Sequence, residues 1–262
     1  MVGKTNLKVL IYDTDFYGLY AINSYLAWDR RTRVVGMAHT VDDIFEWVDE
    51  HIEAEWPDVA LLDTYGLSVP NDMALLVYQV RERIPDVQVM VLEREPSLDM
   101  ALAILDAGAS AYFMRDDVGL QIAWAIVWAQ RPEFAISKSI RTIIPADIND
   151  DRLRHAILLP EKRLYLELTD RIREAIQLCV VEGMSADLAA DEMGVSTHTI
   201  RSYVKEGYRI LESYDEDQEY PPEMSAQERA FMRFTALQDD DPVDDVVEPE
   251  GEDESDAWEG GK

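Results

Sequence analysis

Five charged side chains stand at the ends of short apolar runs in the first half of the chain, and their types suggest chemistry. They are Asp13, Asp15, Asp63, Glu93 and Arg115. Carboxylate oxygens are ligands for hard divalent cations such as Mg²⁺, and carboxylates pair strongly with a guanidinium. If the fold brings these groups together, they can hold a metal ion or close into a network of ion pairs.

A second group of polar side chains lies on a stretch with helical spacing near the C-terminal end. When Ile200 and Val204, four residues apart, face inward, the neighbouring positions face solvent. Hydroxyl and imidazole groups suit contacts to phosphates and base edges, and arginine and lysine add positive charge. The outward side chains, which suit contacts to a nucleic acid, are Thr197, His198, Arg201, Ser202 and Lys205.

The first group needs a parallel sheet to bring it together, and the pattern of residues 1–130 predicts one. Short apolar runs that suit buried strands alternate with stretches of helical spacing. Such alternation is typical of a doubly wound α/β fold, here with five parallel strands, whose functional site lies at the carboxyl ends of the strands. The strands are expected at 7–12, 34–38, 59–62, 87–92 and 111–114, and the helices at 17–27, 41–52, 74–84, 98–107 and 120–129.

The rest of the chain changes character several times. Residues 131–163 contain three prolines and no sustained periodicity, which predicts a linker. Residues 164–214 have a purely helical pattern that predicts an all-α domain, and residues 215–238 include a possible short amphipathic helix. Residues 239–262 are rich in acidic residues and are expected to form a disordered tail.

The helical domain carries capping and turn residues at defined places. Thr169 and Ser196 suit helix N-caps, Gly183 and Gly194 suit turns after helices, and Ala189 allows two helices to cross closely. With these residues, 166–213 resembles the LuxR-type helix-turn-helix. The resemblance implies a DNA-binding domain in which Arg201 matches a basic position that contacts DNA. A helical hairpin that packs against another protein remains the alternative.

The first domain, joined to this helix-turn-helix, resembles the receiver domain of response regulators of the NarL/FixJ type. By that resemblance Asp63 is the phosphoacceptor-like residue. The family also uses an acidic pair for a divalent metal, a Ser or Thr, and a Lys. Here Thr14 stands where the second acid is expected and Asp15 is displaced by one position, while Glu93 replaces the Ser or Thr and Arg115 replaces the Lys. Tyr112 keeps the family's aromatic position.

These departures predict an atypical receiver. Glu93 would repel a phosphoryl group, and it is expected to pair with Arg115 and fill the pocket. We therefore expect a domain that takes no phosphoryl group, needs no cofactor and serves dimerisation or protein contacts. In the alternative, Asp13, Asp15 and Asp63 still bind Mg²⁺ and phosphate in a shifted geometry.

Composition limits the remaining choices. The 262 residues are about twice a typical domain, and an apolar content of 47% suffices for a buried core. Cys179 is the only cysteine, which excludes an intrachain disulfide and suits a reducing cytoplasm. No apolar run reaches about 18 residues, so no membrane segment is predicted.

The net charge of −29 argues against nucleic-acid binding when it is taken as a whole, but about half of it lies in the last 48 residues. This acidic end suits a solubilising extension, a competitor of DNA, or a docking segment for RNA polymerase or another regulatory protein. Adaptation to high salt would also explain the acidic balance.

Together these observations predict a cytoplasmic transcription regulator that is not an enzyme and binds double-stranded DNA as a homodimer. Trp124 and Trp128, four residues apart, either form a dimer face or pack against the sheet. The alternatives are a protein-interaction adaptor and a conventional response regulator controlled by phosphorylation.

Overall fold

Seven parallel strands form one sheet in the computed structural model, which describes residues 6–214 and 223–237. Their order across the sheet is β2-β1-β3-β4-β5-β6-β7, so the first strand lies next to one edge and the last strand forms the other edge. The strands are β1 (Leu7–Tyr12), β2 (Thr32–Ala38), β3 (Val59–Asp63), β4 (Gln88–Glu93), β5 (Ala111–Met114), β6 (Ala135–Ile136) and β7 (Ile157–Leu158).

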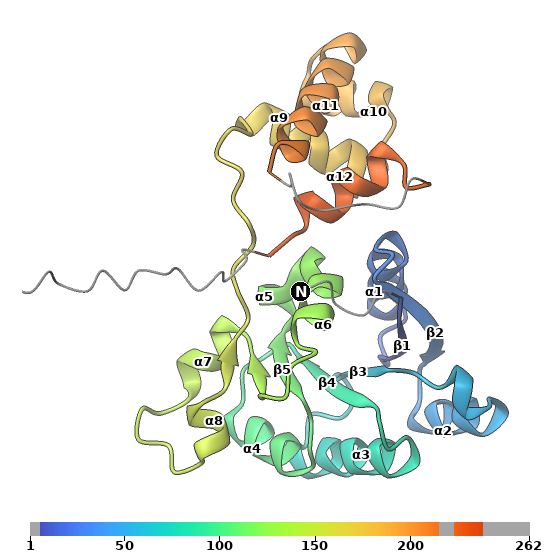
Figure 1. Cartoon of the computed structure of the whole chain (residues 1–262), viewed down its shortest axis with the longest axis vertical. Helices are drawn as coiled ribbons and strands as arrows, with labels where there is room; N and C mark the ends of the chain where they lie inside the picture. Colours follow the sequence, from blue (N-terminus) through green and yellow to red (C-terminus); the bar gives the residue numbers. More distant parts are fainter. Residues whose placement is uncertain (1–5, 215–222, 238–262) are drawn as a thin grey trace, which may run out of the picture.

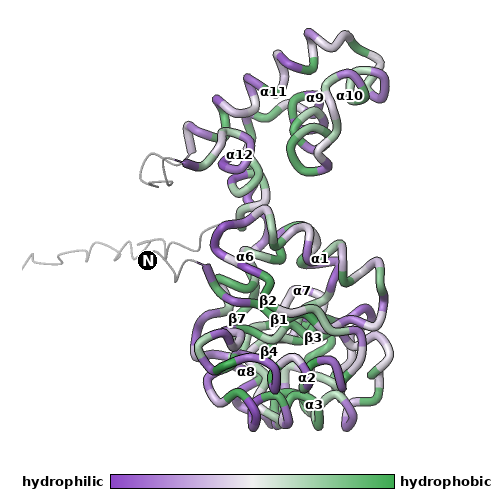
Figure 2. Tube along the Cα trace, turned by 90° about the vertical axis from the view of Figure 1, so that its right-hand side faces the viewer, coloured by the Kyte–Doolittle hydropathy of each residue, from purple (hydrophilic) through white to green (hydrophobic). Residues whose placement is uncertain are grey.

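Helices cover both faces of this sheet, which is why the strands are continuous apolar runs rather than alternating ones. Every residue of β3 and β5 is buried. In Figure 2 the strands lie in the middle, with α1 and α6 on one side and α2 and α3 on the other. The helices are α1 (Phe16–Trp28), α2 (Val41–Glu50), α3 (Pro70–Arg83), α4 (Leu98–Asp106), α5 (Arg115–Val118), α6 (Ile122–Trp128), α7 (Lys138–Ile143) and α8 (Asp151–Arg154).

The predicted α/β fold class is confirmed, but the prediction of five strands and of a linker over 131–163 is wrong. That segment contributes β6, α7, α8 and β7, which extend the sheet beyond β5. Each added strand has only two residues and each added helix at most six, so neither has room to show a period. The sheet therefore continues through a stretch whose prolines suggest a linker.

The C-terminal residues form a separate helical unit, drawn in orange at the top of Figure 1. It contains α9 (Asp170–Ile176), a π-helical turn (Gln177–Val181), α10 (Ala186–Met193) and α11 (Thr197–Glu212). Among residues 6–214 and 223–237 no helix combines the length and apolar character needed to cross a membrane.

Helices α9 and α11 cross closely at Gly207. A Cβ atom at Gly207 would lie 2.6 Å from Cγ1 and 2.7 Å from Cδ1 of Ile176. We expect Gly207→Val to lower the free energy of unfolding by about 1–3 kcal/mol, because an added side chain overpacks this contact. Urea denaturation measures the effect, and Ser202→Val, an exposed position on the same helix, is the control. An equal loss in both variants would contradict the close crossing.

A further helix, α12 (Ala226–Phe234), lies between the helical unit and the sheet domain (Figure 1). Ser225 caps it, in a capping box with Glu228. Its Phe231 ring lies 5.8 Å from the ring of Trp28 in α1, and the Nε1 of Trp124 in α6 donates to the Met232 carbonyl oxygen at 2.9 Å. Because Phe231 and Phe234 are also buried in the core cluster of the helical unit, helix α12 contacts both parts of the molecule.

The chain beyond α12 also returns to the segment that joins the two parts. The amide of Arg163 donates to the Ala236 carbonyl oxygen at 2.8 Å, and Lys162 forms an antiparallel bridge with Leu237. Leu237 is buried in the cluster that α6 shares with the sheet. Two stretches of chain, not one, thus lie side by side where the domains meet.

Candidate functional site

The register of the sheet brings Asp13 and Asp63 to the same edge. Tyr12 of β1 is paired with Leu62 of β3, so the next residue of each strand emerges at the carboxyl end beside the other. Both carboxylates are buried. Arg115, the first residue of α5, donates from Nε to Asp63 and from Nη2 to Asp13. One guanidinium therefore bridges two buried acids.

The ionisation of Asp63 and that of Arg115 depend on each other. Burial raises the pKa of Asp63, because an ionised carboxyl loses its water, and the Arg115 guanidinium offsets this only in part. Burial acts to lower the pKa of Arg115, but Asp63 and Asp13 outweigh it and hold that pKa above its usual value. Arg115 thus remains a fixed positive charge in the pocket.

Gly18 of α1 leaves the space in which these groups meet. A Cβ atom there would collide with the Asp13 carboxylate and lie 3.0 Å from Nη1 of Arg115. The carboxylate set does not fit Mg²⁺ in this arrangement, because the guanidinium lies against both Asp13 and Asp63, the acids that a cation would need. Within the described ranges, no three His, Cys, Asp or Glu side chains are placed to share a metal ion.

Thr14 and Asp15 lie at the rim of the pocket rather than in its centre. The Thr14 hydroxyl donates to the Tyr65 carbonyl oxygen at 2.8 Å, and the Asp15 carboxylate caps α1. Arg94 pairs with Asp15 at 3.1 Å, and its guanidinium carbon lies 4.2 Å from the centre of the Tyr65 ring. The Arg94 hydrogen bond lowers the pKa of Asp15. Asp63 is 1% exposed beneath this layer.

Glu93 does not pair with Arg115, which corrects the expectation from the sequence. Its Oε1 accepts from the Thr64 hydroxyl at 2.6 Å and from the Arg94 amide at 2.8 Å, and its Oε2 accepts from the Tyr112 hydroxyl at 3.1 Å. Burial, together with the negative Glu93, raises the pKa of Tyr112. Glu93 and Tyr112 therefore form a second buried polar contact, separate from the one that joins Arg115 to Asp13 and Asp63.

Sequence reasoning missed Thr64, Tyr65 and Arg94. Each of them lies within two residues of a strand-end acid, since Thr64 and Tyr65 follow Asp63 and Arg94 follows Glu93. Their position directly after a strand was the available signal, because such residues share the same edge of a parallel sheet.

The helix-turn-helix is built by local hydrogen bonds. Thr169, Ser185 and Ser196 cap α9, α10 and α11, each accepting from a backbone amide of the first turn. Gly194 has φ 65° in the turn between α10 and α11, a left-handed conformation that favours glycine. Ala189 is buried in a cluster with Ile200. These contacts fix which face of α11 meets solvent.

That face carries four of the five predicted DNA-binding residues in exposed positions. His198, Arg201, Ser202 and Lys205 are exposed on α11. Thr197 is half-buried, and its hydroxyl donates to the Asp187 carboxylate at 2.8 Å, so it also joins α11 to α10.

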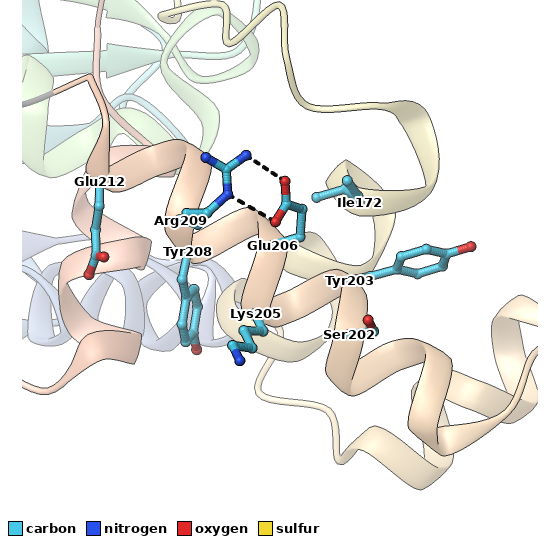
Figure 3. Close-up of a pocket in the computed structure, with 8 residues that line it drawn as sticks. All are labelled: Ile172, Ser202, Tyr203, Lys205, Glu206, Tyr208, Arg209 and Glu212. Atoms are coloured by element: carbon cyan, nitrogen blue, oxygen red, sulfur yellow. Dashed lines mark hydrogen bonds and ion pairs between the residues drawn. The ribbon is translucent and has the colours of Figure 1, made fainter.

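The cations of this domain differ in their partners. Arg171 pairs with Glu174 at 3.1 Å and Arg209 with Glu206 at 2.6 Å. No ion pair is recorded for Arg201 or Lys205 within the part of the chain that the structure describes. Figure 3 shows Lys205 on α11, with Arg209 turned to Glu206. A groove at this helix is lined by Ile172, Ser202, Tyr203, Lys205, Glu206, Tyr208, Arg209 and Glu212.

Comparisons with known proteins match this chain to transcription regulators. Residues 168–211 match the family model described as helix-turn-helix, Psq domain. The chain is 28% identical over 200 residues to the DNA-binding transcriptional activator DevR/DosR of Mycobacterium tuberculosis, covering 76% of this chain and 85% of that protein. It is 24% identical over 213 residues to the transcriptional regulatory protein YhcZ of Bacillus subtilis, covering 81% and 92%.

Solved structures were matched at lower similarity. The response regulator RcsB of Salmonella typhimurium matches with 19% identity and a TM-score of 0.44, covering 79% of this chain and 92% of that one. The signal receiver domain of NarL from Mycobacterium tuberculosis matches with 23% identity and a TM-score of 0.41, covering 48% and 97%. The sequence relatives and the family model agree with the resemblance to transcription regulators that carry a helix-turn-helix.

Proposed function

We propose that this chain, which is similar to response regulators of the NarL/FixJ type, is a DNA-binding transcription regulator. It acts in the cytoplasm on double-stranded DNA, as a homodimer and with no catalytic role. The observation that carries the proposal is the exposed face of α11, where Arg201 and Lys205 stand outward with no recorded acidic partner in the described residues. Phosphate affinity requires such unneutralised cations.

The receiver-like domain works without phosphorylation in this proposal. Asp63 is buried, its carboxylate is held by Arg115, and Arg94 and Tyr65 cover the approach. A phosphoryl group brings further negative charge, and the two guanidiniums near Asp63 are already paired with other acids, Arg115 with Asp13 and Arg94 with Asp15. These contacts support a pocket in which the Asp63 carboxylate already has its partner without a phosphoryl group. In this proposal the domain serves protein contacts.

An anisotropy titration of the full chain against labelled DNA from its own promoter region tests the main proposal. We expect sequence-preferring binding without a phosphodonor, and weaker binding as the salt concentration rises. The domain has few free cations, so the affinity is expected to be modest. Absence of binding at low salt would overturn the proposal in favour of a protein-interaction adaptor.

Treatment with acetyl phosphate and Mg²⁺ separates this receiver from a conventional one. We expect the Kd for DNA to change less than about twofold, and Asp63→Asn to respond in the same way, because Arg115 excludes metal and phosphate. The measurement is the same titration with and without the phosphodonor. A phosphodonor effect that Asp63→Asn abolishes would instead establish regulation by phosphorylation.

A further inference from the structure

Helices α2 and α3 enclose a hollow of about 390 Å³ on the surface of the sheet domain. It is lined by Phe45 of α2 and by Gln79, Glu82 and Arg83 of α3. The Arg83 guanidinium pairs with Asp49, which joins the two helices beside the hollow. Both helices lie on the side of the sheet domain that faces away from the helical unit (Figure 1, Figure 2). The hollow shares no residue with the strand-end pocket or with α11.

Exposed apolar side chains continue from the hollow along α3. Leu75 lies four residues before Gln79 and seven before Glu82, so the three share one face of the helix. Leu75 is 55% exposed and Tyr78, its neighbour on the next turn, is 56% exposed. Phe45 packs against the core from the other side of the hollow. We call the hollow together with Leu75 and Tyr78 the α2–α3 groove.

The charge around the α2–α3 groove is negative. Half of the ten residues of α2 are acidic, and none is lysine or arginine. The two arginines near the end of α3 do not offset this charge, because Arg83 is paired with Asp49 and Arg81 lies against Gly108, which follows α4. The exposed acids of α2 are Asp42, Glu46, Asp49 and Glu50.

Helix α2 holds these acids on a fixed support. Thr40 and Asp43 form a capping box at its start. Beyond its end, the Trp56 indole donates to the carbonyl oxygens of Val48 and His51 at 3.3 and 3.1 Å. A surface that is already ordered loses little conformational entropy when a partner binds.

The charge limits what can cover the α2–α3 groove. Nucleic acids and anionic lipid surfaces carry negative charge and are repelled by the acids of α2. A second copy of this chain brings the same acids and a net charge of −29. A partner must therefore supply positive charge toward α2 and apolar side chains toward Leu75 and Tyr78. An amphipathic basic helix has both, at a spacing of three and four residues.

We propose that the α2–α3 groove binds a basic amphipathic helix of another protein. This names the surface and the kind of partner for the protein contacts proposed for the receiver-like domain, and it rests on that proposal. Because α2 and α3 face away from the helical unit, a partner bound there leaves α11 open to DNA (Figure 1).

An anisotropy titration of the full chain against a labelled model peptide tests the groove. The probe is an amidated leucine–lysine peptide of about 14 residues, or four helical turns, with its leucines on one face. The matched probe is a scrambled peptide of the same composition, which has the same charge but no apolar face. We expect the amphipathic peptide to bind about tenfold more tightly. Equal binding of both peptides would overturn the proposal.

Substitution of the apolar side chains locates the binding. Leu75→Ser with Tyr78→Ser should weaken binding of the amphipathic peptide about tenfold, because the buried apolar contact is lost. Both positions are exposed, so the fold should be retained. The matched control is Tyr17→Ser with Tyr20→Ser, which has the same spacing on the exposed side of α1. Equal weakening in the two pairs would place the peptide elsewhere and overturn the proposal.

Substitution of the acids tests the charge. Glu46→Gln with Glu50→Gln should weaken binding of the peptide several-fold and make it less sensitive to salt. The matched control is Asp191→Asn with Glu192→Gln, which removes two exposed acids from α10. An equal effect in both pairs would mean a general attraction to an acidic chain, and the proposal would fail.

Two further measurements on Leu75→Ser with Tyr78→Ser separate this proposal from others. Analytical ultracentrifugation should show the same oligomeric state as the wild type, whereas loss of a dimer would assign the α2–α3 groove to a second copy and overturn the proposal. DNA titration should show unchanged affinity. A wild-type chain that binds the peptide but no DNA would refute the proposed function alone, and one that binds DNA but not the peptide would refute the groove alone.

Discussion

Arg201→Ala together with Lys205→Ala lowers the affinity for duplex DNA about 100-fold, because each lost contact costs roughly 1–3 kcal/mol and 1.4 kcal/mol is a tenfold change. Both side chains are exposed on α11 with no recorded acidic partner in the described ranges. The slope of log affinity against log salt should also become shallower by about 2. Fluorescence anisotropy at several salt concentrations measures both quantities.

The matched control is Arg171→Ala together with Arg209→Ala, which removes the same charge from cations that already pair with Glu174 and Glu206. We expect its effect on DNA affinity to be several-fold smaller. The test pair should change thermal stability little, since exposed substitutions rarely exceed about 0.5 kcal/mol. A large loss of stability would mean that α11 presents another face to DNA.

Arg115→Met should be strongly destabilising. The substitution leaves Asp13 and Asp63 buried without their shared cation, and breaking a buried ion pair typically costs about 3–5 kcal/mol. Millimolar Mg²⁺ should restore part of this stability, because the vacated space lies against two carboxylates. Urea denaturation with and without Mg²⁺ measures both effects.

The deficit of Arg115→Met should also depend on pH. Burial already raises the pKa of Asp63, and loss of the guanidinium raises it further. A group whose pKa is higher in the folded state than in the unfolded state favours folding at low pH. The deficit should therefore be largest at neutral pH and shrink as the pH falls through the raised pKa.

Arg94→Met is the control for this pocket, since Arg94 and its partner Asp15 are both partly exposed and the Arg94 Nε lies 4.0 Å from Asp63 Oδ1, at the limit of an ion pair. It should cost less than about 1 kcal/mol. A similar loss of stability in Arg94→Met and Arg115→Met would contradict the inference that Arg115 neutralises the two buried acids. A loss of stability in Arg115→Met that Mg²⁺ and pH leave unchanged would contradict it as well.

The strand-end acids show what the sequence can predict. Asp13 and Asp63 follow apolar runs, and parallel pairing of those runs necessarily places them side by side. The partner of Arg115 could not be predicted in the same way. Arg115 reaches Asp13 and Asp63 rather than Glu93 because of its side-chain rotamer and the space at Gly18, and neither leaves a pattern in the sequence.

The helix-turn-helix was predictable because its signals are local. Ser196 and Gly194 act within one turn of the helix that they cap or end, so their types indicate helix boundaries directly. Strands β6 and β7 were not predictable, since two-residue strands depend on the neighbouring strand for their existence. The position of α12 likewise depends on contacts with Trp28 and Trp124, distant in the chain.

The paired stretches at Arg163 and Ala236 affect how the two domains can move. A single linker allows a domain to rotate about each of its backbone bonds, whereas two antiparallel stretches of chain joined by a hydrogen bond resist twisting. Rotation of the helix-turn-helix relative to the sheet domain would have to break this pairing and separate α12 from α1. The paired stretches therefore restrict rotation of the helix-turn-helix relative to the sheet domain more than a single linker would.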